Sequence, residues 1–199
     1  MKAKYLWLDL ETTGLDPKTN CILECAALVT DAKLNQISNS VERVLKFNEN
    51  NRICGEPIDA FVEIMHTKNG LWDECKIAAT TAYQLDFVLR YYIGQFEWES
   101  KPILAGATIH FDRGFLKQYC PYFERELNHR YLDVSSLKLM LVDVFEEPFA
   151  KANAHRAMAD VLESLGQARE IYRRIKADRA AADAPEWQLD EYHQRHRDD

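Results

Sequence analysis

The feature that most constrains this chain is a pair of acidic residues that closes an apolar segment near the N-terminus. Asp9 and Glu11 follow the run Tyr-Leu-Trp-Leu at residues 5–8, which has the character of a buried strand. Side chains alternate along a strand, so Asp9 and Glu11 should project to the same side. Two carboxylates at that spacing repel unless a cation lies between them, and such hard oxygen ligands suit Mg²⁺ or Mn²⁺. The pair therefore predicts a metal-dependent site of the phosphoryl-transfer type.

Three later residues extend this site, although each has a plain alternative. Asp112 opens a predicted helix and could be its N-cap. His155 could be a satisfied histidine beside a helix start, and Asp160 an ordinary exposed helical residue. The Asp-x-Glu pair could also be a solvated strand end, but buried carboxylates are rarely tolerated unpaired. All five residues fall at the ends of predicted elements, and this joint arrangement is much less expected by chance than any one of the plain alternatives.

The order of predicted elements indicates one α/β domain on a mixed sheet flanked by helices. Strands are predicted near residues 4–9, 21–30 and 36–47, which would form a β-meander, and near 102–106 and 131–134. Helices are predicted near residues 80–96, from residue 112 onward, from the end of the 131–134 strand through residue 145, and over residues 156–176. The stretch 48–75 is expected to mix loop and short helix. The composition turns polar after Ala177, so residues 1–177 are expected to form the domain and 178–199 a polar tail.

Composition and charge limit the compartment and the partner. No signal peptide is evident, and no apolar stretch approaches the roughly 20 residues that a membrane helix needs. The five cysteines contain no CxxC pair, which favours reduced thiols in a cytosolic protein over a zinc site or a disulfide framework. The formal charge of −7 and the lack of a dense Lys/Arg stripe argue against a grip on long nucleic acid. A nucleic-acid substrate should therefore be short.

Several segments together resemble one enzyme family. Asp9-x-Glu11, Asp112 and His155-x4-Asp160 are similar to the three motifs of the DEDDh exonucleases, the superfamily of the DnaQ proofreading subunit. The closer resemblance is to oligoribonuclease, and it spans roughly residues 4–176. The segments that carry it are residues 9–17 (DLETTGLDP), 28–32 (LVTDA), 66–71 (HTKNGL), 112–116 (DRGFL), 130–135 (RYLDVS) and 155–160 (HRAMAD). The resemblance implies an RNase H-like exonuclease domain.

The resemblance also implies a mechanism and a division of roles. Asp9, Glu11, Asp112 and Asp160 would hold two divalent ions, Mg²⁺ or Mn²⁺, about 4 Å apart around the scissile phosphate. His155 would accept the proton of the attacking water, since histidine is suited to this near neutral pH. The reaction would be 3′→5′ removal of nucleoside 5′-monophosphates.

A second set of residues is implied to bind the substrate and to favour dinucleotides. Leu15 matches a leucine that wedges between two bases, although it could be core filler instead. A polar cap over the 5′ phosphate is matched by four residues: His66, Thr108 (a serine in the family), Arg130 and Ser135. Arg130 offers a planar fork to a terminal phosphate, with a salt bridge to Asp133 as its alternative.

Several departures from oligoribonuclease lie around the substrate positions. Thr12 stands where the family has methionine, Phe61 replaces a tryptophan near the bases, and Gly106-Ala107-Thr108 replaces Gly-Asn-Ser. His129 replaces a tyrosine that reaches into the partner subunit's site. Selection for a 2′-OH needs a donor or acceptor at contact distance, so the preference for RNA or DNA stays open.

Other functions are compatible with parts of the sequence. A polymerase-associated proofreading subunit would need a docking segment, and only a short polar stretch with His193 and His196 follows Ala177. A catalytically dead nucleic-acid-binding module would be expected to lack a carboxylate or the histidine. The resemblance further implies a homodimer, for which the aromatic-rich helix at residues 83–96 could be core or interface.

Overall fold

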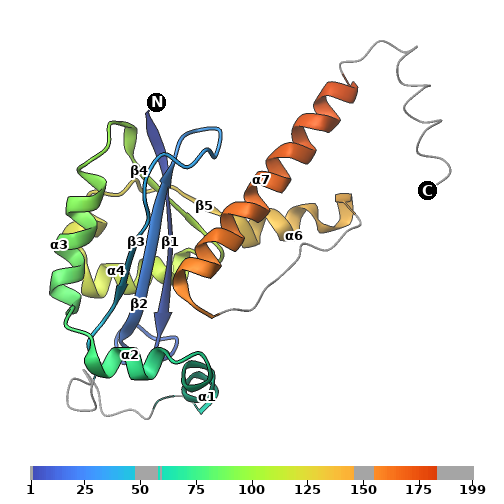
Figure 1. Ribbon diagram of the computed structural model, residues 1–199. Coiled ribbons are helices and arrows are strands. Elements are labelled where there is room, and N and C mark those ends of the chain that lie inside the picture. The colour runs from blue at the N-terminus through green and yellow to red at the C-terminus, as the bar shows by residue number, and fades with distance from the viewer. Residues whose placement is uncertain (1, 48–57, 59, 146–154, 183–199) are drawn as a thin grey trace.

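A five-stranded mixed sheet forms the centre of the protein (Figure 1). The computed structural model describes residues 2–47, 58, 60–145 and 155–182. The sheet has the order β3-β2-β1-β4-β5. Its strands are β1 (Ala3–Thr12), β2 (Ile22–Thr30), β3 (Val41–Val44), β4 (Trp98–Gly106) and β5 (Tyr131–Asp133).

The sheet combines an antiparallel half with a parallel half. β1 runs antiparallel to β2, and β2 antiparallel to β3, which is the predicted meander. β4 runs parallel to β1, and β5 parallel to β4. β1 is therefore a central strand, paired on both edges, and the parallel strands β1 and β4 end on the same side of the sheet.

Helices cover both faces and the lower end of the sheet. They are α1 (Ala60–Lys68), α2 (Leu71–Ile77), α3 (Ala82–Ile93), α4 (His110–Tyr119), α5 (Pro121–Glu124), α6 (Val134–Phe145) and α7 (Ala157–Ala182). In Figure 1, α3 and α4 lie on one face of the sheet and α6 and α7 on the other. α1 and α2 lie near the end at which β1 finishes. This arrangement confirms a single α/β domain on a mixed sheet with flanking helices.

The alternation of β1 divides the core between the two faces. Leu6, Leu8 and Leu10 belong to the cluster that packs against α3, α4 and α5. Trp7 belongs to the opposite cluster, together with Val161 and Leu165 of α7. Asp9 and Glu11 continue the Trp7 side by strand alternation, and therefore project toward the face that α7 covers.

Two predicted elements differ in extent from the structure. The third strand is shorter than residues 36–47, because its continuous ladder with β2 covers Val41–Val44, and Gln36 forms an isolated bridge with Thr30. α7 continues past residue 176 to Ala182, so the proposed domain boundary at residue 177 falls within this helix. Tyr172 and Ile175 continue the helical spacing of the buried residues Val161, Leu165 and Ala168, but both are exposed, and Ile171 is buried instead. The last residues, 183–199, lie outside the described part.

The aromatic row of α3 faces solvent. Tyr83, Phe87 and Tyr91 are exposed, whereas Leu85 and Leu89 are fully buried in the core. The buried face is thus offset from the aromatic one, and a capping box of Thr81 and Gln84 begins the helix. Among the described residues, no helix has the length and apolar character needed to cross a membrane.

Candidate active site

Three carboxylates converge where β1 meets α7. One ligand oxygen from each of Asp9, Glu11 and Asp160 lies within 4.8 Å of the other two. Asp9 and Glu11 are brought together by strand alternation, and Asp160 lies in the first turn of α7. Burial of Val161 and Leu165 fixes α7 against the sheet, which brings Asp160 over the end of β1. The predicted pairing of the first and last motifs is thus present in the fold.

Asp112 approaches the same strand from α4. Its side chain is 3% exposed, and its Oδ1 accepts a hydrogen bond from the backbone N–H of Leu10 at 2.9 Å. Ile109, not Asp112, is the N-cap of α4, so the capping alternative is wrong. The negative charge of Asp112 helps to raise the pKa of Asp9, which places the two groups within electrostatic reach. Asp112 is not one of the three residues that meet within 4.8 Å.

The charged forms of Asp9, Glu11 and Asp112 are unfavourable in the absence of a cation. Burial, and then the charges of Asp9, Asp160 and Glu24, raise the pKa of Glu11 from its ordinary 4.5 to about 9. Burial also raises the pKa of Asp9, followed by the charges of Asp112 and Asp160. Burial raises the pKa of Asp112, against the hydrogen bond from Leu10. Burial and mutual repulsion thus disfavour the charged forms of these carboxyls, and an all-oxygen donor set of this charge fits divalent cations.

His155 lies just before α7 at the mouth of a cavity. Its backbone has a φ of 50°, in the left-handed region. Its carbonyl accepts a hydrogen bond of 2.6 Å from Nδ2 of Asn69. His155 lines a cavity of about 790 Å³ together with Glu11, Leu15 and Phe61. The predicted general base and one predicted metal ligand therefore face the same space.

The walls of this cavity include two exposed apolar side chains. Leu15 is 81% exposed and Phe61 is 68% exposed. The alternative in which Leu15 fills the core is therefore wrong. Leu15 lies in the loop between β1 and β2, and Phe61 in α1, so two separate elements present apolar surface beside the acidic group.

Two of the four predicted cap residues lie together. Oγ1 of Thr108 and Oγ of Ser135 are 3.1 Å apart, and Oδ1 of Asp133 accepts from the backbone N–H of Thr108. Arg130 is exposed, and the described residues give its guanidinium no salt bridge with Asp133. His129 is exposed too, and its carbonyl accepts from Arg113.

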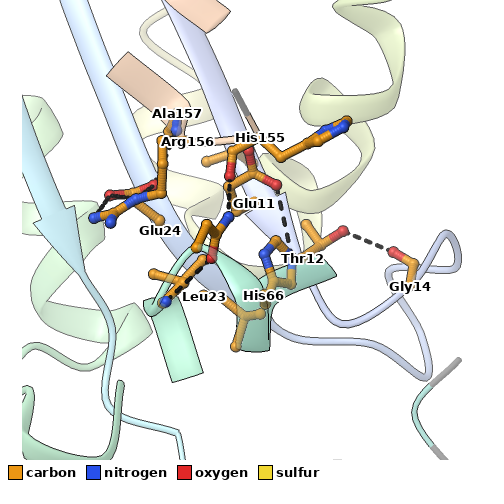
Figure 2. Close-up of polar contacts among 12 residues, drawn as sticks. Glu11, Thr12, Gly14, Leu23, Glu24, His66, His155, Arg156 and Ala157 are labelled. Atoms are coloured by element: carbon orange, nitrogen blue, oxygen red, sulfur yellow. Dashed lines mark hydrogen bonds and ion pairs between the residues drawn. The ribbon is translucent and has the colours of Figure 1, made fainter. Parts of the chain in front are cut away.

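His66 differs from the other predicted cap residues. Its side chain is fully buried, and its Nε2 lies 3.7 Å from Oε2 of Glu11 (Figure 2). Its ring packs edge-on against Trp72 with centroids 5.8 Å apart. Burial lowers the pKa of His66, which favours the neutral imidazole. His66 thus lies between Trp72 and the predicted metal ligand Glu11, at the end of β1.

A charged cluster beside the site was not predicted. Glu24 of β2 is buried and pairs in register with Glu11. Arg156 binds both Glu24 and Glu74 through its guanidinium, as Figure 2 shows for Glu24. Glu24 is the sole charged residue in the otherwise apolar sequence of β2, and that isolation was a signal in the sequence. We refer to these three residues as the Glu24–Arg156–Glu74 cluster.

Comparison with known proteins defines the class of this chain. A family model described as Exonuclease matches residues 6–167. The chain belongs to this exonuclease family, and it is a 3′→5′ exonuclease, a hydrolase.

Individual relatives agree with the resemblance noted in the sequence. The oligoribonuclease of Corynebacterium diphtheriae is 36% identical over 177 residues, covering 86% of this chain and 82% of the relative. The oligoribonuclease of Streptomyces avermitilis is 33% identical and covers 85% of each chain. The predicted membership in the DEDDh exonucleases, with the nearest resemblance to oligoribonuclease, is confirmed.

Solved structures support the fold. Exonuclease I of E. coli, in a zinc-bound complex with single-stranded DNA, superposes with a TM-score of 0.68 at 17% identity. Exonuclease I of Methylocaldum szegediense gives 0.65 at 18% identity. The matches cover 87% of this chain, but this chain spans only about 41% of either exonuclease I. The RNase H-like exonuclease architecture is confirmed.

Proposed function

We propose that this protein hydrolyses short single-stranded oligonucleotides, preferably dinucleotides, from the 3′ end to nucleoside 5′-monophosphates. The observation that supports this most directly is the meeting of Asp9, Glu11 and Asp160 within 4.8 Å beside the cavity that His155 lines. The oligoribonuclease relatives support a short substrate, and the formal charge of −7 agrees with it.

The roles follow from the donor set. Asp9, Glu11, Asp112 and Asp160 would hold two divalent ions, Mg²⁺ or Mn²⁺. When bound, such ions orient the scissile phosphate, activate water and neutralise the charge that develops on the departing oxygen. His155 would accept a proton from the attacking water, since its position at the cavity wall leaves it accessible to substrate and solvent.

Length selection would come from the apolar residues that line the cavity and from the polar cap residues. Leu15 and Phe61 present apolar surface on which bases can pack, and both are exposed in the absence of substrate. Thr108 and Ser135 would bind a 5′ phosphate with hydroxyl groups, and Arg130 with its planar guanidinium. A terminal phosphate held there would limit the substrate to the few nucleotides between the cap and the carboxylates.

The preference for RNA or DNA is left open by the residues around the substrate. Oγ1 of Thr12 donates to the carbonyl of Gly14 at 2.8 Å, and Oγ1 of Thr13 accepts from the backbone N–H of Cys21. Both hydroxyls thus shape the loop that carries Leu15. Neither is assigned to a sugar 2′-OH, so an oligoribonuclease and a dinucleotide-preferring DNase are both consistent with this site.

The assembly and location belong to the proposal as well. We infer a homodimer in which the exposed aromatic face of α3, formed by Tyr83, Phe87 and Tyr91, contributes to the interface. His129 is exposed near the cap, where a side chain could reach a neighbouring subunit. We also infer that the exonuclease domain, expected over residues 1–177, extends to the end of α7 at Ala182. We further propose a cytoplasmic location, in agreement with the unpaired cysteines among the described residues.

The proofreading alternative is not favoured. The two oligoribonucleases described above match most of the chain, and the matches cover 82% and 85% of their lengths. His193 and His196, in the polar stretch after Ala177, lie outside the described residues. A catalytically dead module is also disfavoured, because all four carboxylates and His155 are present.

The test is a side-by-side digestion of 5′-phosphorylated RNA and DNA oligomers of two to seven nucleotides with Mn²⁺. We expect mononucleotide release that is fastest with dimers. Asp160→Asn, which removes one ligand charge at constant size, should abolish turnover. Uniform stepwise trimming of long strands would refute the length limit, and absence of mononucleotides from every oligomer would refute the enzyme itself.

A further inference from the structure

The two residues before α7 are held by three other elements of the fold. Nε and Nη2 of Arg156 bind the carboxylate of Glu24 in β2 at 2.8–3.2 Å. Nη1 and Nη2 bind the carboxylate of Glu74 in α2, both at 2.9 Å. Oε2 of Glu24 also accepts from the backbone N–H of Ala157 at 2.9 Å. The Glu24–Arg156–Glu74 cluster therefore fixes the first turn of α7 to β2 and α2.

A separate contact holds the residue just before this cluster. Nδ2 of Asn69 donates to the carbonyl of His155, and Oδ1 of Asn69 accepts from the backbone N–H of Leu71. One side chain thus orders the start of α2 and the backbone of His155 at the same time. Asn69 lies in the turn between α1 and α2, where the next residue, Gly70, has a φ of 79°.

These contacts maintain an unfavourable backbone conformation. His155 has a φ of 50°, a region that residues with a Cβ seldom adopt without support. Because backbone geometry sets the direction of the Cα–Cβ bond, it also sets where the imidazole can reach. In Figure 2, the His155 ring points away from Glu24 and Arg156, on the opposite side from the cluster. His155 is also one of the residues that line the cavity beside Glu11.

Glu24 has no free oxygen with which to act as a further metal ligand. Both of its carboxylate oxygens accept hydrogen bonds from Arg156, and one also accepts from Ala157. The positive charge of Arg156 moreover opposes the rise in the pKa of Glu11. The hydrogen bonds of the cluster are therefore with the segment that carries His155, whereas its charges act on Glu11 only through space.

We propose that Asn69 and the Glu24–Arg156–Glu74 cluster are positioning residues, which hold His155 in its left-handed conformation so that the imidazole enters the substrate cavity. This inference rests on the proposed role of His155 as the proton acceptor. Asn69 acts on the carbonyl of His155 from one side, and the cluster fixes the following residues from the other. The turn between α1 and α2 thereby contributes to catalysis without contact with substrate.

The experiment uses two matched variants of Asn69 in the full-length chain. Asn69→Asp keeps an acceptor for the N–H of Leu71 but loses the donor to His155, whereas Asn69→Ala loses both. Residues that orient a catalytic group typically change activity by roughly 10–100-fold, so we expect at least a tenfold lower kcat in both variants. KM for a dinucleotide, Mn²⁺ affinity and the thermal midpoint of Asn69→Asp should stay close to wild type. A wild-type kcat in Asn69→Asp would overturn the proposal.

A double-mutant cycle separates positioning from general damage. Because Asn69 acts through His155, Asn69→Asp should cause no further loss of kcat in a His155→Ala background. An equal loss in both backgrounds would overturn the inference while leaving the exonuclease proposal intact. Full activity of His155→Ala would instead overturn the role of His155 on which the inference rests.

The cluster can be tested in parallel. Arg156→Lys keeps the positive charge but not the planar fork that binds two carboxylates, and Arg156→Met removes both. We expect Arg156→Met to lower kcat and thermal stability, because it leaves Glu24 buried without a partner, and Arg156→Lys to restore stability more fully than kcat. If Arg156→Lys restored kcat and thermal stability equally, the cluster would have only a structural role, and its part in positioning His155 would be overturned.

Discussion

At the scale of single residues, the candidate site brings several carboxylates together where they are largely shielded from solvent. Asp9, Glu11 and Asp112 all have a raised pKa, and in each case burial is the largest cause. The arrangement is unfavourable without a counterion, and a divalent cation relieves it. The chemistry of the site and its stability are thus linked to the same ions.

This linkage predicts the pH dependence of the metal-free protein. Unfolded Glu11 loses its proton near 4.5, whereas the folded residue keeps it until about 9. Stability from this group is fully present below the lower value and is lost as pH rises toward the upper one. In the presence of a chelator, the thermal midpoint should therefore fall across this window, and Mn²⁺ should raise it most at the alkaline end. Glu11→Gln should show a shallower dependence, and an unchanged slope would contradict the assignment.

Arg130 supplies a second prediction at this scale. Arg130→Ala should raise KM for a 5′-phosphorylated dinucleotide by roughly tenfold, because a charge-assisted contact is lost. KM for the 5′-hydroxyl dinucleotide should change little, since that substrate has no terminal phosphate. Arg125→Ala removes the same charge from another exposed site and serves as the control. Equal effects on both substrates would place Arg130 outside the cap.

At the scale of elements, the site depends on how closely β1 and β4 pack where they end together. A Cβ added at Gly106 would lie 2.8 Å from the carbonyl oxygen of Leu8 and 3.0 Å from Cδ1 of Ile109. Such contacts force the backbone to shift. Gly106 therefore permits the close approach that brings α4, and Asp112 on it, to β1.

Gly106→Ala should accordingly weaken both the fold and the reaction. We expect a loss of about 1–3 kcal/mol in the free energy of unfolding, as for other overpacked sites, together with reduced kcat. Gly166→Ala is the matched control, because a Cβ there meets nothing within 4 Å. Denaturant unfolding of the two variants would measure the change in the free energy of unfolding, and dinucleotide turnover would measure the change in kcat. Comparable results for both would contradict this role of Gly106.

The elements also show which inferences the sequence allowed. Strand alternation is local, so the shared direction of Asp9 and Glu11 was predictable from residues 5–11 alone. The role of Glu24 was not, since its partner Arg156 lies 132 residues further along the chain. The burial of His66 depends on how α1 packs at the end of β1, and local pattern carries no such information. The sequence likewise left open whether the aromatic row of α3 lies in the core or on the surface, because Leu85 and Leu89 compete with that row for the core.

At the scale of the whole molecule, the exposed aromatic face of α3 bears on assembly. Phe87→Glu places a charge at the centre of the row formed with Tyr83 and Tyr91, and it should convert the proposed dimer to a monomer. Leu139→Glu, at an exposed apolar position on α6, should leave assembly unchanged. Sedimentation velocity would measure both. A wild-type protein that sediments as a monomer with full activity would contradict the dimer.

The predicted metal ligands and the predicted substrate-binding residues lie in different settings. The carboxylates belong to the packed interior or its margin, whereas Leu15, Phe61 and Arg130 stand in solvent on loops and helix surfaces. Exchanges at solvent-facing positions usually alter stability by less than about 0.5 kcal/mol. Natural substitutions at these exposed positions can therefore change substrate recognition with little effect on the stability of the buried carboxylate site. Sequence differences among such enzymes should accordingly concentrate at these exposed positions, while the buried strand β1 stays constant.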